Sequence, residues 1–431
     1  MGGGGKTTAI FQLARALIEK TNQPVIVTAT SHLGVEQVIQ ADLHIALSEN
    51  KDWDLKQVLS RGVIVITGPQ IDEKLRPIHD DALQQLVAYC DAHSLPLLVE
   101  ADGSRQKPVK AWAAHEPPIP SFIEHVVQVV GLSAIGQPVK DVAHRPGIFS
   151  GLTDLQPIEA VTTESVVRVL THADAGLKNM PNAAIRTVLL NQADNDQLQG
   201  LAFGMVTGLL HSYDTVIIAQ LNAEKILAVH EHIAGVVLAA GASTRYGEPK
   251  QLLSWQNQPF VRAVAQKALN AGLHPVLVIT GAKAEEVEAA VTGLDVQVVR
   301  NIDWEQGQST SVRAAITALK KQTEIQLGGA IFLLVDQPQI GSAILRALMQ
   351  THAKELASIL IPMIDGQRAN PVLFDRLTFD DLLTLEGDQG GRAIFHRYRV
   401  QFLPWYDDSL LLDVDTPEMY QRLLSDPTLG N

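Results

Sequence analysis

The stretch VVLAAGASTRYGEPKQLL, residues 236–253, decides the fold. It begins with a continuous apolar run, which is typical of a strand buried on both faces of a parallel sheet. The run ends in Ala-Ala-Gly, where small residues let the backbone approach a ligand closely. Ser243, Arg245 and Lys250 follow, and cations beside exposed backbone N–H groups favour a triphosphate. The stretch therefore predicts an α/β fold with a nucleotide site beyond the end of a strand.

The same alternation of apolar, β-branched runs with amphipathic helical segments extends over the whole chain. It predicts an α/β protein built on parallel sheets. The pattern restarts after residues 222–233, which predicts an N-terminal domain at 1–230 and a C-terminal domain at 231–431. Strands are expected at 24–30, 62–68, 95–102, 125–132, 186–194, 214–221, 235–241, 274–281, 296–301, 330–338 and 358–364, and helices at 259–271, 283–292 and 309–320.

Composition narrows the classes of function. The 431 residues are too many for one ordinary core, which agrees with two domains. The net charge of −13 disfavours nucleic-acid binding, because such binding needs cations to neutralise phosphates. Cys90 is the single cysteine, so no internal disulfide can form, and a reducing compartment fits. The sequence also contains neither a bilayer-spanning apolar run nor a secretory leader pattern. We therefore expect a cytoplasmic protein without nucleic-acid or membrane partners.

Two acidic segments complete the predicted C-terminal site. Asp336 follows an apolar run in FLLVDQPQI, residues 332–340; as an alternative it caps a helix at 341–354. In LLLDVDTPEMYQRLL, residues 410–424, a strand-like part ends in Asp413 and Asp415, and Thr416–Pro417 opens a helix. Mg²⁺ prefers one or two carboxylates together with substrate phosphates, and open α/β sheets bind ligands beyond the carboxyl ends of their strands. We favour Asp415 over Asp413 as the second metal ligand.

The spacing of these motifs resembles the MobA/MocA-like nucleotidyltransferases. The signature LAAG-x-S-x-R-x-G-x-x-K is complete, and NIDWEQGQSTSVRAAI, LVDQP, NPVLF, GDQGGR and DVDTPE follow in order over about 234–424. The chain is most similar to molybdenum cofactor cytidylyltransferases and to relatives linked to selenium-dependent molybdenum hydroxylases. The resemblance implies a Rossmann-like domain of the GT-A type that transfers CMP from CTP to molybdopterin, or to its molybdenum-loaded form, and releases pyrophosphate. Members that use GTP carry LAGG, so Ala240 implies CTP.

The resemblance also implies roles for individual residues. Arg245, Lys250 and Asp336 would be catalytic, and Asp336 and Asp415 would hold Mg²⁺. Ser309 would face the nucleotide, although it could instead cap the helix at 309–320. The remaining implied contacts are with the nucleotide at Ala239, Ala240, Gly241 and Arg313, and with the pterin at Asn370, Asp388 and Arg392. Within GDQGGR, Gly391 stands where Ala is more usual.

The first residues, MGGGGKTT, suggest a second nucleotide site. The full phosphate-loop pattern would need another glycine before Met1, so the motif is incomplete by spacing. Gly4 and Gly5 can still form an anion-binding nest at a helix N-terminus, with Lys6 for phosphate charge and Thr7 for Mg²⁺. The alternative is a disordered start or a degenerate loop. Because a strand normally precedes such a loop, a shortened chain or a misplaced start codon is also expected.

Two later motifs accompany this loop. The stretch LLVEADGS, residues 97–104, ends an apolar run in Glu100 and Asp102, which are candidate metal ligands. The stretch LLNQAD, residues 189–194, resembles the guanine-reading N-K-x-D element with Asn191 and Asp194 in place, although Gln192 replaces the lysine. The ligand of the N-terminal domain is therefore left open between GTP and ATP.

With HEPPIP at 115–120 and HRPGIF at 144–149, the N-terminal motifs resemble the selenium cofactor biosynthesis family YqeC over about 1–220. This resemblance implies a P-loop-like α/β domain that acts in the maturation of selenium-dependent molybdenum hydroxylases. The segment KPVK, residues 107–110, could bind an acidic ligand together with His115, or could be a solvated loop.

Together the motifs predict a bifunctional enzyme with Mg²⁺ as cofactor. Its partners would be molybdopterin or the molybdenum cofactor and the apoenzyme of a molybdenum hydroxylase. A nucleotide-gated, molybdopterin-binding chaperone without transferase activity is the alternative from another class. A transferase with a sugar phosphate as acceptor is the third hypothesis.

Overall fold

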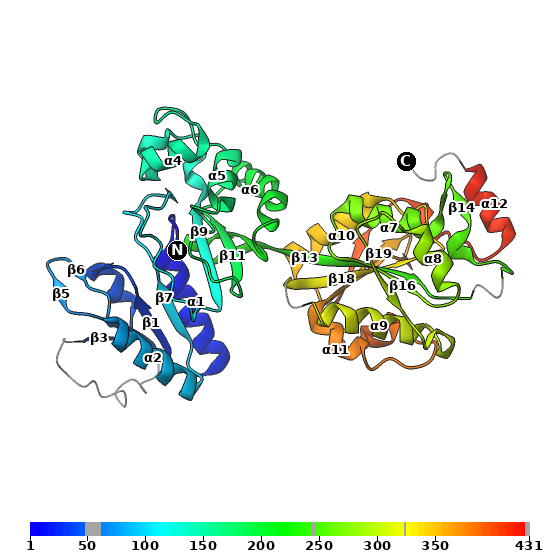
Figure 1. Cartoon of the computed structure of the whole chain (residues 1–431), viewed down its shortest axis with the longest axis horizontal. Coiled ribbons are helices and arrows are strands. Elements are labelled where there is room, and N and C mark those ends of the chain that lie inside the picture. The colour runs from blue at the N-terminus through cyan, green and yellow to red at the C-terminus, as the bar shows by residue number, and fades with distance from the viewer. Residues whose placement is uncertain (48–61, 243–245, 323–324, 427–431) are drawn as a thin grey trace. The chain divides into compact units, whose positions relative to one another are not determined.

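The computed structural model describes residues 1–47, 62–242, 246–322 and 325–426 (Figure 1). The chain divides into two compact units, Met1–Ala228 and Val229–Asn431. We call them unit 1 and unit 2 and describe each by itself. Within the described ranges, no helix is both long enough and apolar enough to cross a membrane.

The first sheet of unit 1 is parallel, with the strand order β3-β4-β1-β7. Its central strands β1 and β4 are buried at every residue, because helices cover both faces. Phe11 of α1 packs on one face and Leu86 of α2 on the other. These elements are β1 (Val25–Ala29), β3 (Leu43–Ala46), β4 (Val63–Thr67), β7 (Leu97–Glu100), α1 (Lys6–Thr21) and α2 (Asp80–His93).

A second parallel sheet in unit 1 has the order β9-β11-β12. The start of the chain pairs with its β9 strand, where the Gly3 amide donates to the Val129 carbonyl at 2.9 Å and the Val129 amide donates to Met1 at 2.9 Å. Met1 and Gly2 thus supply a short strand-like lead into the glycine loop. The strands are β9 (His125–Gly131), β11 (Ile185–Asn191) and β12 (Thr215–Gln220), and the helices nearby are α5 (Thr163–Thr171) and α6 (Asp196–Leu210).

Short elements complete unit 1. The remaining strands form a small antiparallel sheet, β2-β6-β5, and a parallel pair, β8-β10. They are β2 (Leu33–Gly34), β5 (Gln70–Ile71), β6 (Lys74–Leu75), β8 (Val109–Lys110) and β10 (Ala143–His144), with the helices α3 (Val139–Val142) and α4 (Pro146–Thr153).

Strand β13 runs from Lys225 to Ala239 and passes from one unit into the other. It is longer than the strand predicted at 235–241. In unit 2 it lies between two parallel neighbours, β16 and β18, and β17 extends the parallel part beyond β16. Beyond β18, strands β21 and β19 continue the sheet in antiparallel pairings. The strands are β16 (Val276–Thr280), β17 (Gln297–Arg300), β18 (Leu327–Leu334), β19 (Ile359–Ile364), β20 (Gln367–Arg368), β21 (Val372–Asp375) and β22 (Val400–Pro404), with a hairpin of β14 (Ser254–Trp255) and β15 (Gln258–Pro259).

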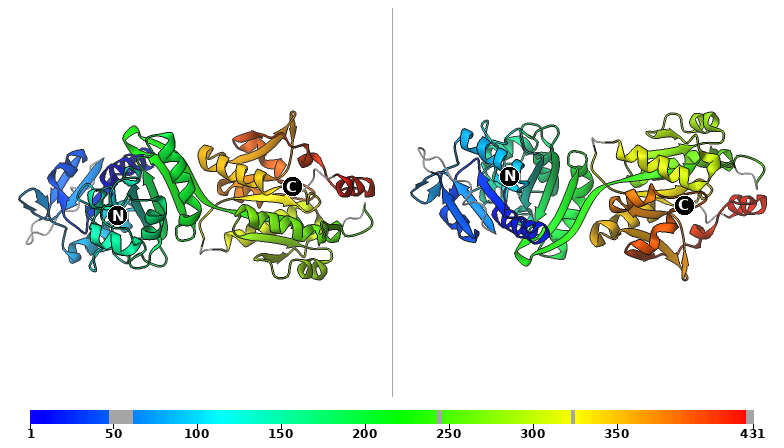
Figure 2. Two further views of the ribbon diagram at one scale, coloured as in Figure 1. Left: turned by 90° about the horizontal axis from the view of Figure 1, so that it is seen from above. Right: turned by 90° about the horizontal axis from the view of Figure 1, so that it is seen from below.

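Helices cover both faces of the sheet of unit 2 (Figures 1 and 2). Side chains of α7, α8 and α10 pack against one face, and those of α9 and α11 against the other. This arrangement explains the continuous apolar runs from which the parallel sheet was predicted. The helices are α7 (Phe260–Ala271), α8 (Ala284–Ala290), α9 (Gln308–Lys320), α10 (Ser342–Glu355), α11 (Phe379–Leu382) and α12 (Pro417–Ser425).

One predicted element is wrong. The run before Asp413 was expected to be strand-like, but residues Asp408–Leu411 form a 3₁₀ helix, in which the Asp407 carboxylate accepts from the Ser409 amide. Leu410 and Leu412 are buried by this turn, so their apolar character reflects core anchoring. The helix predicted to open at Thr416–Pro417 is confirmed, and the Thr416 hydroxyl accepts from the Met419 amide.

Candidate functional site

In unit 2 the candidate site lies where the adjacent strands β13 and β18 end. The loop 240–242 follows β13, and Asp336 follows β18 by two residues. The buried Gln251 side chain holds this loop, because its Nε2 donates to the carbonyl of Gly241 at 3.0 Å and lies 3.4 Å from that of Ala239. The carboxyl ends of two parallel strands therefore bring the glycine-containing loop and the first carboxylate to one crevice.

Lys250 joins the carboxylates of this crevice. Its ammonium lies 3.4 Å from Asp336 Oδ2 and forms a shorter ion pair with Asp415. The lysine side chain is 11% exposed, whereas that of Asp415 is 49% exposed. Burial raises the pKa of Asp336, and Asp413 and Asp415 add to this rise, while Lys250 opposes it. Three of the predicted residues thus meet, and Arg245 and Ser243 lie outside the described residues.

Two glutamines hold the segment 409–415 against the end of β18. The Gln337 amide donates to Asp413 Oδ1 at 2.6 Å, and the Gln339 amide donates to the carbonyls of Ser409 at 2.9 Å and Leu412 at 2.7 Å. The Val414 amide adds a bond to the Asp336 carbonyl at 3.1 Å. These bonds engage Asp413 with Gln337 and leave Asp415 facing Lys250.

Sequence reasoning missed these glutamines. The signal was a pair of amides flanking Pro338 in DQPQ, directly after an apolar run. Both side chains are buried, and a buried amide needs a hydrogen-bonding partner, which points to a bracing role.

Two adjoining pockets open at the crevice. The first, of about 450 Å³, is lined by Ala240, Gly241, Lys250 and Asp336, with Trp304 among its other walls. The second, of about 320 Å³, is lined by the three residues with an implied pterin role, Asn370, Asp388 and Arg392. Both pockets share the lining residues Leu238, Gln308, Leu334 and Asp388. A ligand in one pocket would therefore lie beside a ligand in the other.

The predicted residue Ser309 lies differently from its neighbours. Helix α9 begins at Gln308 with Gly307 as its N-cap, so the alternative that Ser309 caps this helix is wrong. Its side chain is completely buried, whereas Gln308 and Ser311 line the larger pocket.

The donor set of the crevice fits Mg²⁺ bound together with a nucleotide. Within the described part of the chain, no group of three or more His, Cys, Asp or Glu residues is arranged to hold a metal by itself. Mg²⁺ commonly takes only one or two protein carboxylates and completes its shell with phosphates and water. Asp336 and Asp415 would supply that number.

In unit 1, Asn191 braces the glycine loop. Its Nδ2 donates to the Gly4 carbonyl at 2.8 Å, and its Oδ1 accepts from the Leu221 amide at 3.0 Å. Gly5 has a φ of 121°, and a Cβ there would lie 2.4 Å from Asn191 Nδ2, so a larger residue would not fit. Helix α1 begins at Lys6 without a side-chain cap. Asp194, which follows Asn191 in the motif LLNQAD, is exposed.

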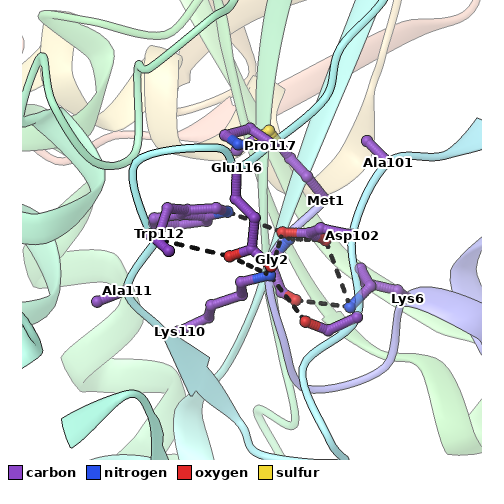
Figure 3. A network of polar contacts seen from close by, with 12 residues as sticks. Met1, Gly2, Lys6, Ala101, Asp102, Lys110, Ala111, Trp112, Glu116 and Pro117 are labelled. Atoms are coloured by element: carbon purple, nitrogen blue, oxygen red, sulfur yellow. Dashed lines mark hydrogen bonds and ion pairs between the residues drawn. The ribbon is translucent and has the colours of Figure 1, made fainter. Parts of the chain in front are cut away.

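Asp102 is the centre of a buried network in unit 1 (Figure 3). It accepts from the Gly2 amide at 3.0 Å and from Trp112 Nε1 at 2.7 Å. It also forms ion pairs with Lys110 at 3.0 Å and Lys6 at 3.6 Å. Burial alone would raise the pKa of Asp102, but Lys6, the terminal ammonium and Lys110 outweigh burial and lower it. Asp102 thus fastens the start of the glycine loop to the segment after β8 that carries Trp112.

The other predicted metal ligands of unit 1 are placed separately. The Thr7 hydroxyl accepts from Gln37 Nε2 at 2.6 Å. Glu100 is buried, and this burial raises its pKa. Sequence reasoning missed the extension of the network, in which Glu116 pairs with Lys110 at 3.4 Å and with Arg145. Glu116 belongs to the motif HEPPIP and Arg145 to the motif HRPGIF, and these two motifs were the available signal.

Comparison with known proteins agrees with this two-unit description. Residues 235–402 match the MobA-like NTP transferase domain family, and residues 1–147 match the YqeC protein family. Nicotine blue oxidoreductase of Paenarthrobacter nicotinovorans is 31% identical over 201 residues, which cover 44% of this chain and 96% of that protein. The chain therefore belongs to the MobA-like NTP transferase family and carries a YqeC domain at its N-terminus.

Two further relatives match different parts of the chain. The uncharacterized protein YqeC of Escherichia coli K12 is 29% identical over 207 residues, which cover 44% of this chain and 74% of that protein. A probable molybdenum cofactor guanylyltransferase of Bacillus cytotoxicus is 30% identical over 141 residues, which cover 33% of this chain and 66% of the relative. The nucleotidyltransferase class follows from the family, and the predicted molybdenum-related ligands are considered below.

Proposed function

We propose that unit 2 transfers CMP from CTP to the terminal phosphate of molybdopterin, or of its molybdenum-loaded form, and releases pyrophosphate. The observation that carries this proposal is that Lys250 and Asp336 line a pocket of about 450 Å³ that adjoins a second pocket, while Lys250 also pairs with Asp415. A transferase needs adjoining sites for donor and acceptor. The likeness to a molybdenum cofactor guanylyltransferase supports a pterin acceptor.

The proposed chemistry requires no protein nucleophile. An oxygen of the acceptor phosphate forms a bond to the α-phosphorus of the nucleotide, and the bond to the bridging oxygen of the β-phosphate breaks, so that pyrophosphate leaves. Bound Mg²⁺ would supply charge neutralisation and orient the phosphates. Lys250, with Arg245 of the same motif, would bind the triphosphate, and the two pockets would hold the reactants next to each other, which is the main contribution of such a site.

Ala240 is the proposed determinant of the base. It lines the larger pocket, and its methyl group narrows the space available to a purine. We propose that this favours CTP, and that Ala240→Gly shifts the preference toward GTP. Asn370, Asp388 and Arg392 in the smaller pocket are the proposed contacts of the pterin.

Unit 1 is proposed to bind a nucleotide, GTP or ATP, at the loop of Gly4, Gly5 and Lys6. The uncapped N-terminus of α1 and the Asn191 brace support this proposal, because free N–H groups at a helix N-terminus attract phosphate. Since Asp102 already accepts from several donors, Thr7 and Glu100 are the better placed metal ligands. A role in delivering or modifying the cofactor of a selenium-dependent molybdenum hydroxylase would follow from the YqeC domain.

Pyrophosphate release tests the proposal. The full chain is incubated with Mg²⁺, molybdopterin and each of the four nucleoside triphosphates, with Asp336→Ala as the inactive control. CTP-dependent release that is lost in the variant supports the proposal. Pterin binding without release would establish the chaperone instead, and release only with a sugar phosphate would establish the third hypothesis.

A further inference from the structure

Lys250 occupies the place between the two acidic side chains that a divalent cation would need. We propose that Lys250 blocks metal binding in the nucleotide-free protein and releases the carboxylates when a triphosphate takes over its ammonium. Mg²⁺ would then enter the site together with the nucleotide and not before it. This inference rests on the proposed function only in assigning Asp336 and Asp415 to the metal.

The Lys250 ammonium lies between two acidic side chains. It contacts carboxylates from two segments, Asp336 Oδ2 at 3.4 Å and Asp415 Oδ1 at closer range. The side chain is 11% exposed, so water screens it only weakly, and a unit charge a few ångström from a divalent ion opposes that ion strongly.

The backbone segments that carry the two carboxylates are also joined to each other by bonds that do not involve Lys250. The Val414 amide bonds to the Asp336 carbonyl at 3.1 Å, and Gln337 and Gln339 fasten residues 409–413 to the end of β18. Removal of the lysine charge would therefore leave these segments joined, and the combined negative charge of the two acids would then attract a cation.

A nucleotide offers Lys250 other partners. Lys250 lines the same pocket as Ala240–Ala242 of the glycine-containing loop, and phosphates bound there would lie within reach of the three donors of its ammonium. Triphosphate and metal would therefore each improve the binding of the other, as linkage between two ligands requires.

Binding of Mn²⁺, as a paramagnetic stand-in for Mg²⁺, tests the proposal without turnover. Free Mn²⁺ is measured by electron paramagnetic resonance at pH 8 in the full chain, first without nucleotide. Lys250→Met is expected to bind Mn²⁺ at least about tenfold more tightly than the wild type, because a nearby repelling charge is gone. Lys250→Gln repeats the removal with a polar side chain, Lys250→Arg keeps the charge and the weak binding, and Lys320→Met removes a surface charge as a matched control.

The same titration is repeated with α,β-methylene-CTP or its guanosine counterpart, and nucleotide should now raise the Mn²⁺ affinity of the wild type more than that of the variant. The wild type gains Mn²⁺ affinity with nucleotide, whereas Lys250→Met loses most of that gain. The proposal would be overturned if, without nucleotide, both Lys250→Met and Lys250→Gln bound Mn²⁺ no more tightly than the wild type. It would also be overturned if the tighter Mn²⁺ binding of Lys250→Met persisted in the double variant that also carries Asp336→Asn. Absence of nucleotide-dependent Mn²⁺ binding in the wild type with both analogues would instead contradict the proposed function.

Discussion

In unit 1, Asp102 has no exposed side-chain surface and is bonded to Gly2, Trp112 and two lysines. In unit 2, Asp336 keeps 24% of its side chain exposed and faces a pocket of about 450 Å³. Both carboxylates follow the end of a parallel strand and pair with a buried lysine. The difference shows that the same pair of residue types can be enclosed by complete bonds, as at Asp102, or stay accessible beside a pocket, as at Asp336.

The largest effect is expected at the open site. Asp336→Asn should lower nucleotidyl transfer by more than about a thousandfold, because the acid that orients the metal and triphosphate is lost. The rate of labelled product formation measures this. Lys6→Met, at the corresponding lysine of unit 1, should leave the rate within about twofold, because catalysis needs only groups of unit 2. A comparable loss in both variants would break the distinction between the units.

The next effect is expected at the closed site. Asp102→Ala should destabilise unit 1 by about 3–5 kcal/mol, since buried Lys6 loses its ion pair with Asp102 and buried Lys110 keeps only the ion pair with Glu116. Urea unfolding followed by circular dichroism measures the change. The matched control is Asp380→Ala, which removes an exposed carboxylate paired with Lys320 and should change stability little. An equal cost for both substitutions would contradict a fastening role for Asp102.

A smaller, pH-dependent effect is expected beside the open site. Lys267 donates to the Pro338 carbonyl at 2.8 Å and lies over Trp255. Burial lowers the pKa of Lys267 to about 8 from 10.5. Between these pH values the lysine is protonated in the unfolded chain but largely neutral in the folded one, so the free energy of unfolding rises with pH. With allowance for partial exposure, the rise should approach about 2 kcal/mol. Urea unfolding at pH 8 and pH 10 should show it in the wild type and in Lys320→Met but not in Lys267→Met.

The smallest effect concerns Asn191, which braces the glycine loop of unit 1. Asn191→Ala removes the bonds to Gly4 and Leu221 and should cost about 1 kcal/mol or slightly more. Asn191→Asp retains the acceptor but loses the donor to the Gly4 carbonyl. The free energy of nucleotide binding by unit 1 should therefore weaken by about the same 1 kcal/mol. Equilibrium dialysis with GTP and ATP measures this binding. Unaltered stability in both variants would show that the loop does not rely on the brace.

Local patterns were enough to predict most of the parallel strands and the helices α7, α8 and α9. A strand buried on both faces needs apolar residues throughout, and β1, β4 and β16 follow this rule. The antiparallel strand β21 and the parallel strands β3 and β22 were missed because a short apolar segment does not reveal its partner. The 3₁₀ turn before Asp413 was mistaken for a strand because core-anchored leucines look alike in both.

The candidate site was predictable in its charged residues but not in its supports. Lys250, Asp336 and Asp415 belong to spaced motifs, and all three meet in the structure. The bonds of Gln337 and Gln339 depend on a segment about seventy residues later, which no local pattern encodes. In unit 1 the sequence likewise could not show that Asp102 is shared by the loop, Trp112 and Lys110, since that follows from tertiary contact alone.

Transfer of labelled nucleotide to molybdopterin tests the central claim most directly. The full chain is incubated with Mg²⁺, molybdopterin and CTP or GTP labelled at the α-phosphate, and the pterin product is separated and counted. The account predicts label on the pterin from CTP in preference to GTP, and almost none with Asp336→Asn. Absence of labelled pterin with either nucleotide, or undiminished labelling in Asp336→Asn, would contradict it.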